Sequence, residues 1–343
     1  MAEESRPIPE RLIAPWIADN QDFLRQIGER LNLLEDATEL RDLLHIRTVE
    51  AAPPTSLGAV DAAVIDVPLG DICSILIQAV RVDADGQTSF GDPIRETGIN
   101  GEELSLARTP LRMLAENILL VDSCTPTIAD TSFWSMLMEV NQTITRRING
   151  GTRNAGINRA YERLVVDGGF LALLENPEVI AMSKSSERIT LAALQARTHQ
   201  FDRALVSDRE LLGQILQPGE FLAPEPLVTG TKGRFGVEKR GFKHDERQAL
   251  RDFYERRLGM TYFKPHPFSR ALRIEARLER LCDDTWLMPL LSALTYHTAD
   301  RSVEPWPQFL ADWTTKRLSA IATLYGMFNF PRTPFFDPAR TLI

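Results

Sequence analysis

The pattern of apolar and polar positions first predicts a helical arm. Residues 9–50 repeat apolar side chains at helical spacing, among them Leu12, Trp16 and Phe23. The pattern breaks at the proline-containing stretch 51–57. We therefore predict an N-terminal arm over residues 1–54, either packed on the core or used in self-association.

Two short apolar runs, residues 62–65 and 72–82, follow the break and are typical of strands. The intervening turn, residues 67–70, predicts a hairpin, and the first run ends at Asp66. An aspartate in that position is also common in ordinary turns.

A helix is expected over residues 111–121, with Pro110 in its first turn, where a missing N–H has no consequence. Arg112 and Glu116 stand four apart on this helix and so share one face. The chain then runs extended into Asp130, and Thr131 or Ser132 can cap a helix that begins at residue 133. This order predicts a helix-borne glutamate close to an aspartate at a strand end.

The remaining pattern is mostly helical. Helices are expected over residues 133–148, 154–174, 205–217, 244–258, 286–299 and 309–328, strands over residues 177–183, 260–264 and 271–278, and a Pro- and Phe-rich tail over residues 329–343.

Composition narrows the class of protein. The 343 residues are 43% hydrophobic and 25% charged, as in a soluble globular protein, and no apolar run is long enough for a membrane span. The polar N-terminus does not resemble a signal peptide, so a cytoplasmic protein is expected. Three widely spaced cysteines predict neither a disulfide framework nor a thiolate zinc site.

Charge does not favour non-specific nucleic-acid binding, because the net charge is −8. A local basic channel remains compatible with that value, since basic residues gather in residues 146–163 and 232–243. There is no nucleotide-binding glycine loop of either common type.

Four residues are candidates for a metal site: Asp66, Glu116, Asp130 and His297. Three carboxylates and an imidazole suit one or two Mg²⁺ or Mn²⁺ ions. Two such ions, about 3.5–4 Å apart, could activate water and stabilise the leaving oxygen of a phosphodiester. The competing interpretation is structural: a surface ion pair at Glu116, a helix-start aspartate at residue 130 and a core histidine.

The order of segments resembles the NurA nuclease family over roughly residues 55–320. The motifs are AAVID ending at Asp66, the Arg112-xxx-Glu116 helix, IADTSFW at Asp130, SKSS at Lys184, VSDRELLGQILQPGE, FSRALRIEARL and TYHTADR at His297.

This resemblance implies an α/β fold, an RNase H-like mixed sheet flanked by helices, as a nuclease domain over residues 55–328. It implies a DNA exonuclease and single-strand endonuclease supported by Mn²⁺ or Mg²⁺. It further implies a homodimer that acts with a HerA-type hexameric ATPase in DNA end resection, repair or phage defence.

By position, the resemblance makes Asp66, Glu116 and Asp130 metal ligands and Lys184 a phosphate contact. His297 would be a fourth ligand or proton shuttle, with Tyr296 and Asp300 as competing residues.

Two departures from the family pattern leave another function open. Val67 follows Asp66 and Thr131 follows Asp130, where the family usually has glycine, and a side chain there restricts the backbone. A catalytically weakened adaptor on the ATPase ring is therefore the alternative to an active nuclease. An RNase or another RNase H-like phosphotransferase is a third hypothesis.

Overall fold

The computed structural model describes residues 41–42, 44–69, 72–98, 101–149, 154–182, 208–227, 240–299, 302 and 304–329. Its strands are β1 (Ile46–Thr48), β2 (Gly58–Leu69), β3 (Ile72–Val82), β4 (Thr88–Phe90), β5 (Ile94–Gly98), β6 (Thr127–Ala129), β7 (Val179–Ala181), β8 (Glu220–Leu222), β9 (Glu225–Pro226), β10 (Leu258–Lys264) and β11 (Leu272–Arg277).

The helices alternate with these strands. They are α4 (Gly101–Val121), α5 (Phe133–Asn149), α6 (Ala155–Tyr161), α7 (Gly169–Glu175), α9 (Asp208–Ile215), α10 (His244–Asp252), α11 (Leu278–Leu281), α12 (Asp284–His297) and α13 (Trp306–Asn329), with π-helical segments η3 (Glu162–Val166) and η5 (Phe253–Arg257). No helix in these ranges is long and apolar enough to cross a membrane.

The strands form one mixed sheet in the order β1-β8-β10-β11-β7-β6-β2-β3-β4, with β5 beside β3 and β9 beside β10. Strands β2 and β3 are an antiparallel hairpin, whereas β2, β6 and β7 run parallel. An antiparallel meander followed by parallel strands on the far side of its first strand is the RNase H-like arrangement. The predicted fold class is confirmed.

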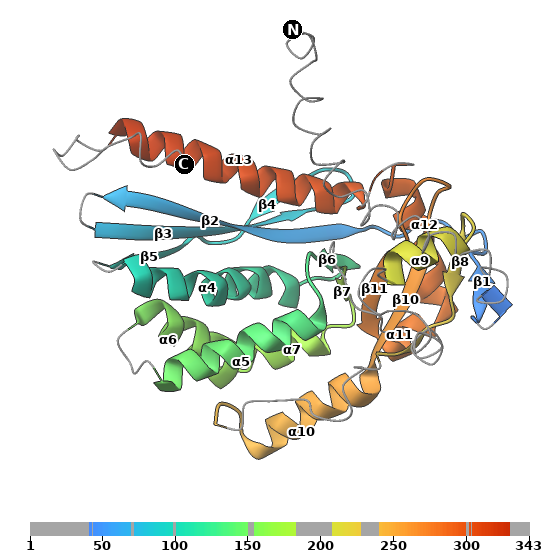
Figure 1. Ribbon diagram of the computed structural model, residues 1–343, viewed down its shortest axis with the longest axis horizontal. Coiled ribbons are helices and arrows are strands. Elements are labelled where there is room, and N and C mark those ends of the chain that lie inside the picture. The colour runs from blue at the N-terminus through green and yellow to red at the C-terminus, as the bar shows by residue number, and fades with distance from the viewer. Residues whose placement is uncertain are drawn as a thin grey trace, which may run out of the picture.

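Helices cover both faces of the sheet (Figure 1). Side chains alternate between the two faces of a strand, so Val60 and Ala62 of β2 join the core beneath α4 through α7. Ala59, the residue before Val60, joins a second core with α12 and Ala311 of α13. The long hairpin β2–β3 is therefore sandwiched between α4 and α13.

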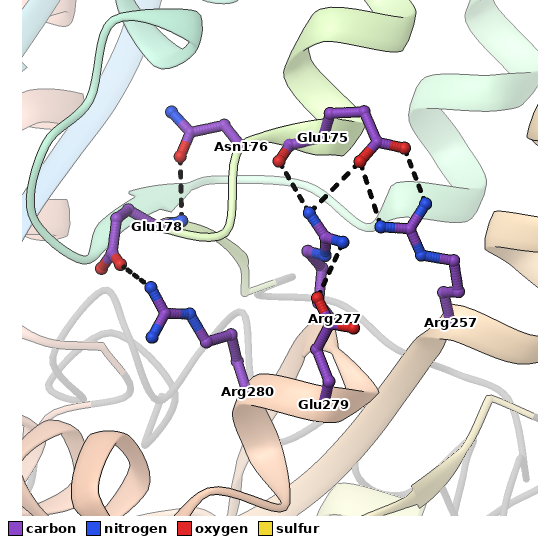
Figure 2. A network of polar contacts seen from close by, with 7 residues as sticks. All are labelled: Glu175, Asn176, Glu178, Arg257, Arg277, Glu279 and Arg280. Atoms are coloured by element: carbon purple, nitrogen blue, oxygen red, sulfur yellow. Dashed lines mark hydrogen bonds and ion pairs between the residues drawn. The ribbon is translucent and has the colours of Figure 1, made fainter.

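Strands β1, β8, β10 and β11 join the rest of the sheet through β7, with which β11 shares the single residue pair Glu275–Ala181. Polar contacts reinforce this junction between the two halves of the sheet. Figure 2 shows Glu175, at the end of α7, accepting hydrogen bonds from Arg257 at 2.7 and 3.0 Å. Arg277 donates to the Glu175 carbonyl at 2.8 Å. Arg280 bonds Glu178 at 2.7 Å. These arginines come from the β10–β11 half and hold it against the end of α7 and the start of β7.

Four local expectations are corrected. The helical pattern predicted to reach residue 50 ends earlier, because Ile46–Thr48 pairs with β8 as a strand. Strand β2 continues through the predicted turn to Leu69. Pro110, expected in the first turn of a helix, lies inside α4, which begins nine residues before it. The helix predicted over residues 154–174 is broken at Gly168. The backbone of Gly168 has a left-handed φ of 75°, which glycine adopts at little cost in free energy.

The predicted arm and tail lie largely outside the described residues, since residues 1–40 and 330–343 are not among them. Their boundaries at residues 54 and 328 stay predictions.

Candidate functional site

Two aspartates lie side by side where β6 ends. The parallel register of β2 and β6 pairs Val60 with Ala129, so the next residues along the two strands are Asp61 and Asp130. Neighbours in register point to the same face of a sheet, here the face covered by α13. Thr315 of α13 donates from Oγ1 to Asp61 Oδ2 at 2.7 Å. Gln308 donates from Nε2 to Asp130 Oδ1 at 2.8 Å.

The environment of Asp61 disfavours its charge. Burial raises the pKa of the Asp61 carboxyl, and the hydrogen bonds from Thr315 and the backbone of Ala62 oppose that rise. The negative charges of Asp130 and Asp312 raise it further. Mutual repulsion of this kind requires the carboxyl groups to be close.

Glu116 reaches the same region from α4. Burial raises its pKa to about 8, Arg112 opposes the shift, and the charges of Asp61, Glu139 and Asp130 add to it. In the described residues β2 is paired beyond Val60 with β3 alone. Glu116, from the α4 side, and Asp61, from the α13 side, can therefore approach each other around this uncovered edge of β2.

Arg112 partly neutralises the acids. Its Nε lies 3.6 Å from Glu116 Oε1 and its Nη2 lies 3.6 Å from Glu139 Oε1 on α5. The Arg112–Glu116 pair is thus one side of an acidic cluster, in which the Glu116 side chain is only 16% exposed. We use "acidic cluster" for Asp61, Glu116 and Asp130.

The donor chemistry of the acidic cluster fits a hard divalent cation. Three carboxylates, from a central strand, a strand end and helix α4, supply only oxygen ligands, which Mg²⁺ and Mn²⁺ prefer. Their mutual repulsion is the interaction that a bound cation would relieve. In the part of the chain that the structure describes, no three His, Cys, Asp or Glu side chains already stand in a metal-holding group. The carboxylate oxygens of the acidic cluster instead pair with Arg112 and accept hydrogen bonds from Thr315 and Gln308.

Asp66, predicted to belong with these acids, lies apart from them. It is five residues beyond Asp61 on β2, about 16 Å along an extended strand, and the odd separation puts it on the opposite face. Its side chain is 55% exposed and pairs with Arg108 of α4 at 2.6 Å. Arg108 is eight residues, or about 12 Å, from Glu116 on the same helix. The structure therefore brings Asp61, in place of Asp66, to Glu116 and Asp130.

The other two predicted residues are not placed in the cluster. His297 is the last residue of α12, its ring lies 5.0 Å from that of Tyr296, and burial lowers its pKa. Lys184 lies outside the described residues, and so does Asp300. The described chain leaves β7 at Met182, whose carbonyl accepts a bond of 3.2 Å from Gln308, the residue that also holds Asp130.

Sequence reasoning missed Asp61 and the α13 residues Gln308, Asp312 and Thr315. A signal for Asp61 exists, because it is an acidic residue within the otherwise apolar run AVDAAVI. The α13 residues recur at positions i, i+4 and i+7, the spacing of one helix face.

Arginines of the basic stretch 146–163 contact neighbouring side chains of the chain itself. Arg159 pairs with Glu96 at 3.4 Å and Arg163 with Asp167 at 3.1 Å, while Arg147 lies over the ring of Tyr161. The second stretch falls largely in residues 232–239, outside the described residues. A basic channel therefore stays a prediction.

Neither a protein-family model nor a curated protein matches the sequence. Solved structures do match. The crystal structure of the NurA nuclease from Sulfolobus solfataricus is 11% identical, with a TM-score of 0.53 over 94% of this chain and 99% of that one.

Two further NurA crystal structures are similar to this chain. NurA bound to dAMP and manganese is 12% identical, with a TM-score of 0.55 over 94% of this chain and 98% of that one. NurA with manganese is 12% identical, with a TM-score of 0.53 over 92% and 100% of the two chains. At this level of identity the likeness concerns the fold, and the chain has the fold of the NurA nucleases.

Proposed function

We propose that the chain is a metal-dependent DNA nuclease that cleaves phosphodiester bonds at the acidic cluster. The observation that carries the proposal is the adjacency of Asp61 and Asp130 in the β2–β6 register, with Glu116 of α4 close enough for the charges of both to raise its pKa. The NurA fold supports it, because one NurA of this fold was crystallised with dAMP and manganese.

In this proposal Asp61, Glu116 and Asp130 hold one or two Mn²⁺ or Mg²⁺ ions. When bound, the ions would supply Lewis-acid stabilisation of the phosphoryl oxygens and a water of lowered pKa. The chain's own contribution is to set the ligands on rigid elements: Asp61 within β2, Asp130 directly after β6 and Glu116 on α4. Lys184 is proposed as a phosphate contact and His297 as a fourth metal ligand or a proton shuttle, as the resemblance implies.

The wider setting follows from the family resemblance. We propose a cytoplasmic homodimer that degrades DNA as an exonuclease and single-strand endonuclease. Its partner would be a HerA-type hexameric ATPase, in end resection, repair or phage defence.

One observation favours the adaptor alternative. Arg112 already places a positive charge beside Glu116 and Glu139, so a cation must compete with a resident guanidinium. If this competition prevents metal binding, the chain would act as a non-catalytic component on the ATPase ring.

A cleavage assay with a matched control separates these functions. End-labelled single- and double-stranded DNA is incubated with Mn²⁺ and the wild type, Asp61→Asn, Asp130→Asn or Asp66→Asn, with and without the partner ATPase. RNA is tested in parallel. We expect DNA cleavage that Asp61→Asn and Asp130→Asn abolish. Asp66→Asn, an identical change on the same strand, should leave cleavage unchanged.

Two outcomes contradict the proposal in different ways. Loss of cleavage in Asp66→Asn but not in Asp61→Asn would move the site along β2. Absence of cleavage under every condition, with ATPase binding intact, would favour the adaptor.

A further inference from the structure

One face of α13 touches both aspartates of the acidic cluster. Gln308 and Thr315 are seven residues apart, two helical turns or about 10.5 Å along the axis. Both residues are 3% exposed. Thr315 bonds Asp61 and Gln308 bonds Asp130, at 2.7 and 2.8 Å. A single helix therefore contacts carboxylates from two different strands.

The hydrogen-bonding capacity of Gln308 is matched to its surroundings. An amide NH₂ group has two hydrogens, and the Nε2 group of Gln308 has two acceptors, Asp130 Oδ1 and the Met182 carbonyl. Because both acceptors require a donor, the NH₂ end of the amide must face them. Gln308 thereby links Asp130 to Met182, the residue that follows β7.

Thr315 has one hydroxyl hydrogen and two acceptors, Asp61 Oδ2 at 2.7 Å and the Asp312 carbonyl at 2.8 Å. A carboxylate is the stronger acceptor of the two, so the hydrogen is directed at Asp61 whenever that group is ionised. A donor that holds one carboxylate oxygen sets the direction of the other. Each donor therefore fixes the orientation of one aspartate.

We propose that Gln308 and Thr315 are positioning residues that orient Asp130 and Asp61 to hold a divalent cation. This inference rests on the proposed metal-dependent function. Hydrogen-bond partners of metal ligands commonly contribute 10- to 100-fold in metal affinity. Removing either donor should weaken Mn²⁺ binding by about that factor.

The test is Mn²⁺ binding, followed by electron paramagnetic resonance of free Mn²⁺ during titration of the full-length protein. Thr315→Val and Gln308→Met remove the hydrogen-bond donors with little change of shape, whereas Thr315→Ser keeps the hydroxyl donor. Thr314→Val is the matched control, because it is the same change at the preceding residue of α13 and so lies on another helix face. Circular dichroism confirms folding, and Thr315→Ala replaces Thr315→Val if the latter does not fold.

We expect Thr315→Val and Gln308→Met to weaken Mn²⁺ binding at least tenfold, and Thr315→Ser and Thr314→Val to change it less than threefold. Wild-type Mn²⁺ affinity in both donor variants would overturn the inference, even if they unfold more easily. DNA cleavage is measured separately. Weakened binding in the variants without any cleavage by the wild type would refute the nuclease and leave the positioning role standing. A wild type that does not bind Mn²⁺ would refute both.

Discussion

Glu116 should make the metal-free protein less stable as the pH rises, and Glu116→Gln should remove that dependence. The ordinary pKa of a glutamate is 4.5, whereas the pKa of Glu116 in the folded protein is about 8, chiefly because of burial. Between these two values the unfolded chain has released the proton and the folded protein still holds it. The unfolded state then binds one proton fewer, so the free energy of unfolding falls by about 1.4 kcal/mol per pH unit.

The magnitude follows from the same two pKa values. Between pH 5 and pH 7.5 the contribution of Glu116 amounts to a loss of about 3 kcal/mol. The neutral amide of Glu116→Gln does not titrate. The free energy of unfolding of this variant, minus that of the wild type, should therefore grow by about 2–3 kcal/mol across that interval.

Urea denaturation at pH 5 and pH 7.5 in the presence of EDTA measures this difference. Glu279→Gln is the matched control, because the Glu279 side chain is 60% exposed and lies outside the acidic cluster. A constant difference between Glu116→Gln and the wild type would show that Glu116 is ionised in the folded protein. That result would refute the inference that burial and the neighbouring acids of the cluster hold Glu116 protonated.

Three other predictions test neighbouring parts of the molecule. Asp61→Asn should lower the pKa of Glu116, since the charge of Asp61 raises it, whereas Asp66→Asn should not; NMR titration of the Glu116 carboxyl would show either outcome. Glu275→Gln should cost about 3 kcal/mol in urea denaturation, because the buried Glu275 carboxylate accepts from Phe133 N and pairs with the buried Arg273; a cost below that of Glu279→Gln would contradict this. Gly168→Ala should destabilise by about 1–2 kcal/mol, as its φ is left-handed. Gly213→Ala, inside α9 with only ordinary contacts for a Cβ, should stabilise by about 0.5–1 kcal/mol, and equal thermal midpoints for the two variants would refute the conformational argument.

Local pattern predicted the elements that turns or capping residues delimit. Strand β3 has the predicted bounds, and its end lies where the apolar run meets a polar segment. Helix α5 begins at Phe133, as predicted, and Ser132 Oγ accepts a bond of 3.1 Å from Ser135 N as its cap. These signals lie within a few residues of one another in sequence. The order of the strands was available only through the family resemblance.

The contacts that complete the site join residues far apart in sequence. Thr315 and Asp61 are 254 residues apart, and Gln308 and Asp130 are 178 apart. Helical spacing shows that Gln308, Asp312 and Thr315 share a face. It does not show what that face covers, which depends on the packing of α13 over β2. For this reason the donors to the aspartates could not be predicted from the sequence.

The choice between Asp61 and Asp66 depends on register, which apolar pattern does not determine. Asp61 interrupts an apolar run, so the sequence pattern predicts a strand that begins after Asp61 and ends at Asp66. In the structure β2 begins earlier, at Gly58, and the pairing of Val60 with Ala129 puts Asp61 beside Asp130. A shift of one residue along a strand moves every side chain to the other face. A charged residue that departs from local pattern is costly to bury, and functional sites are where such departures are expected. The same feature that obscured the beginning of β2 therefore marks Asp61 as the aspartate of the candidate site.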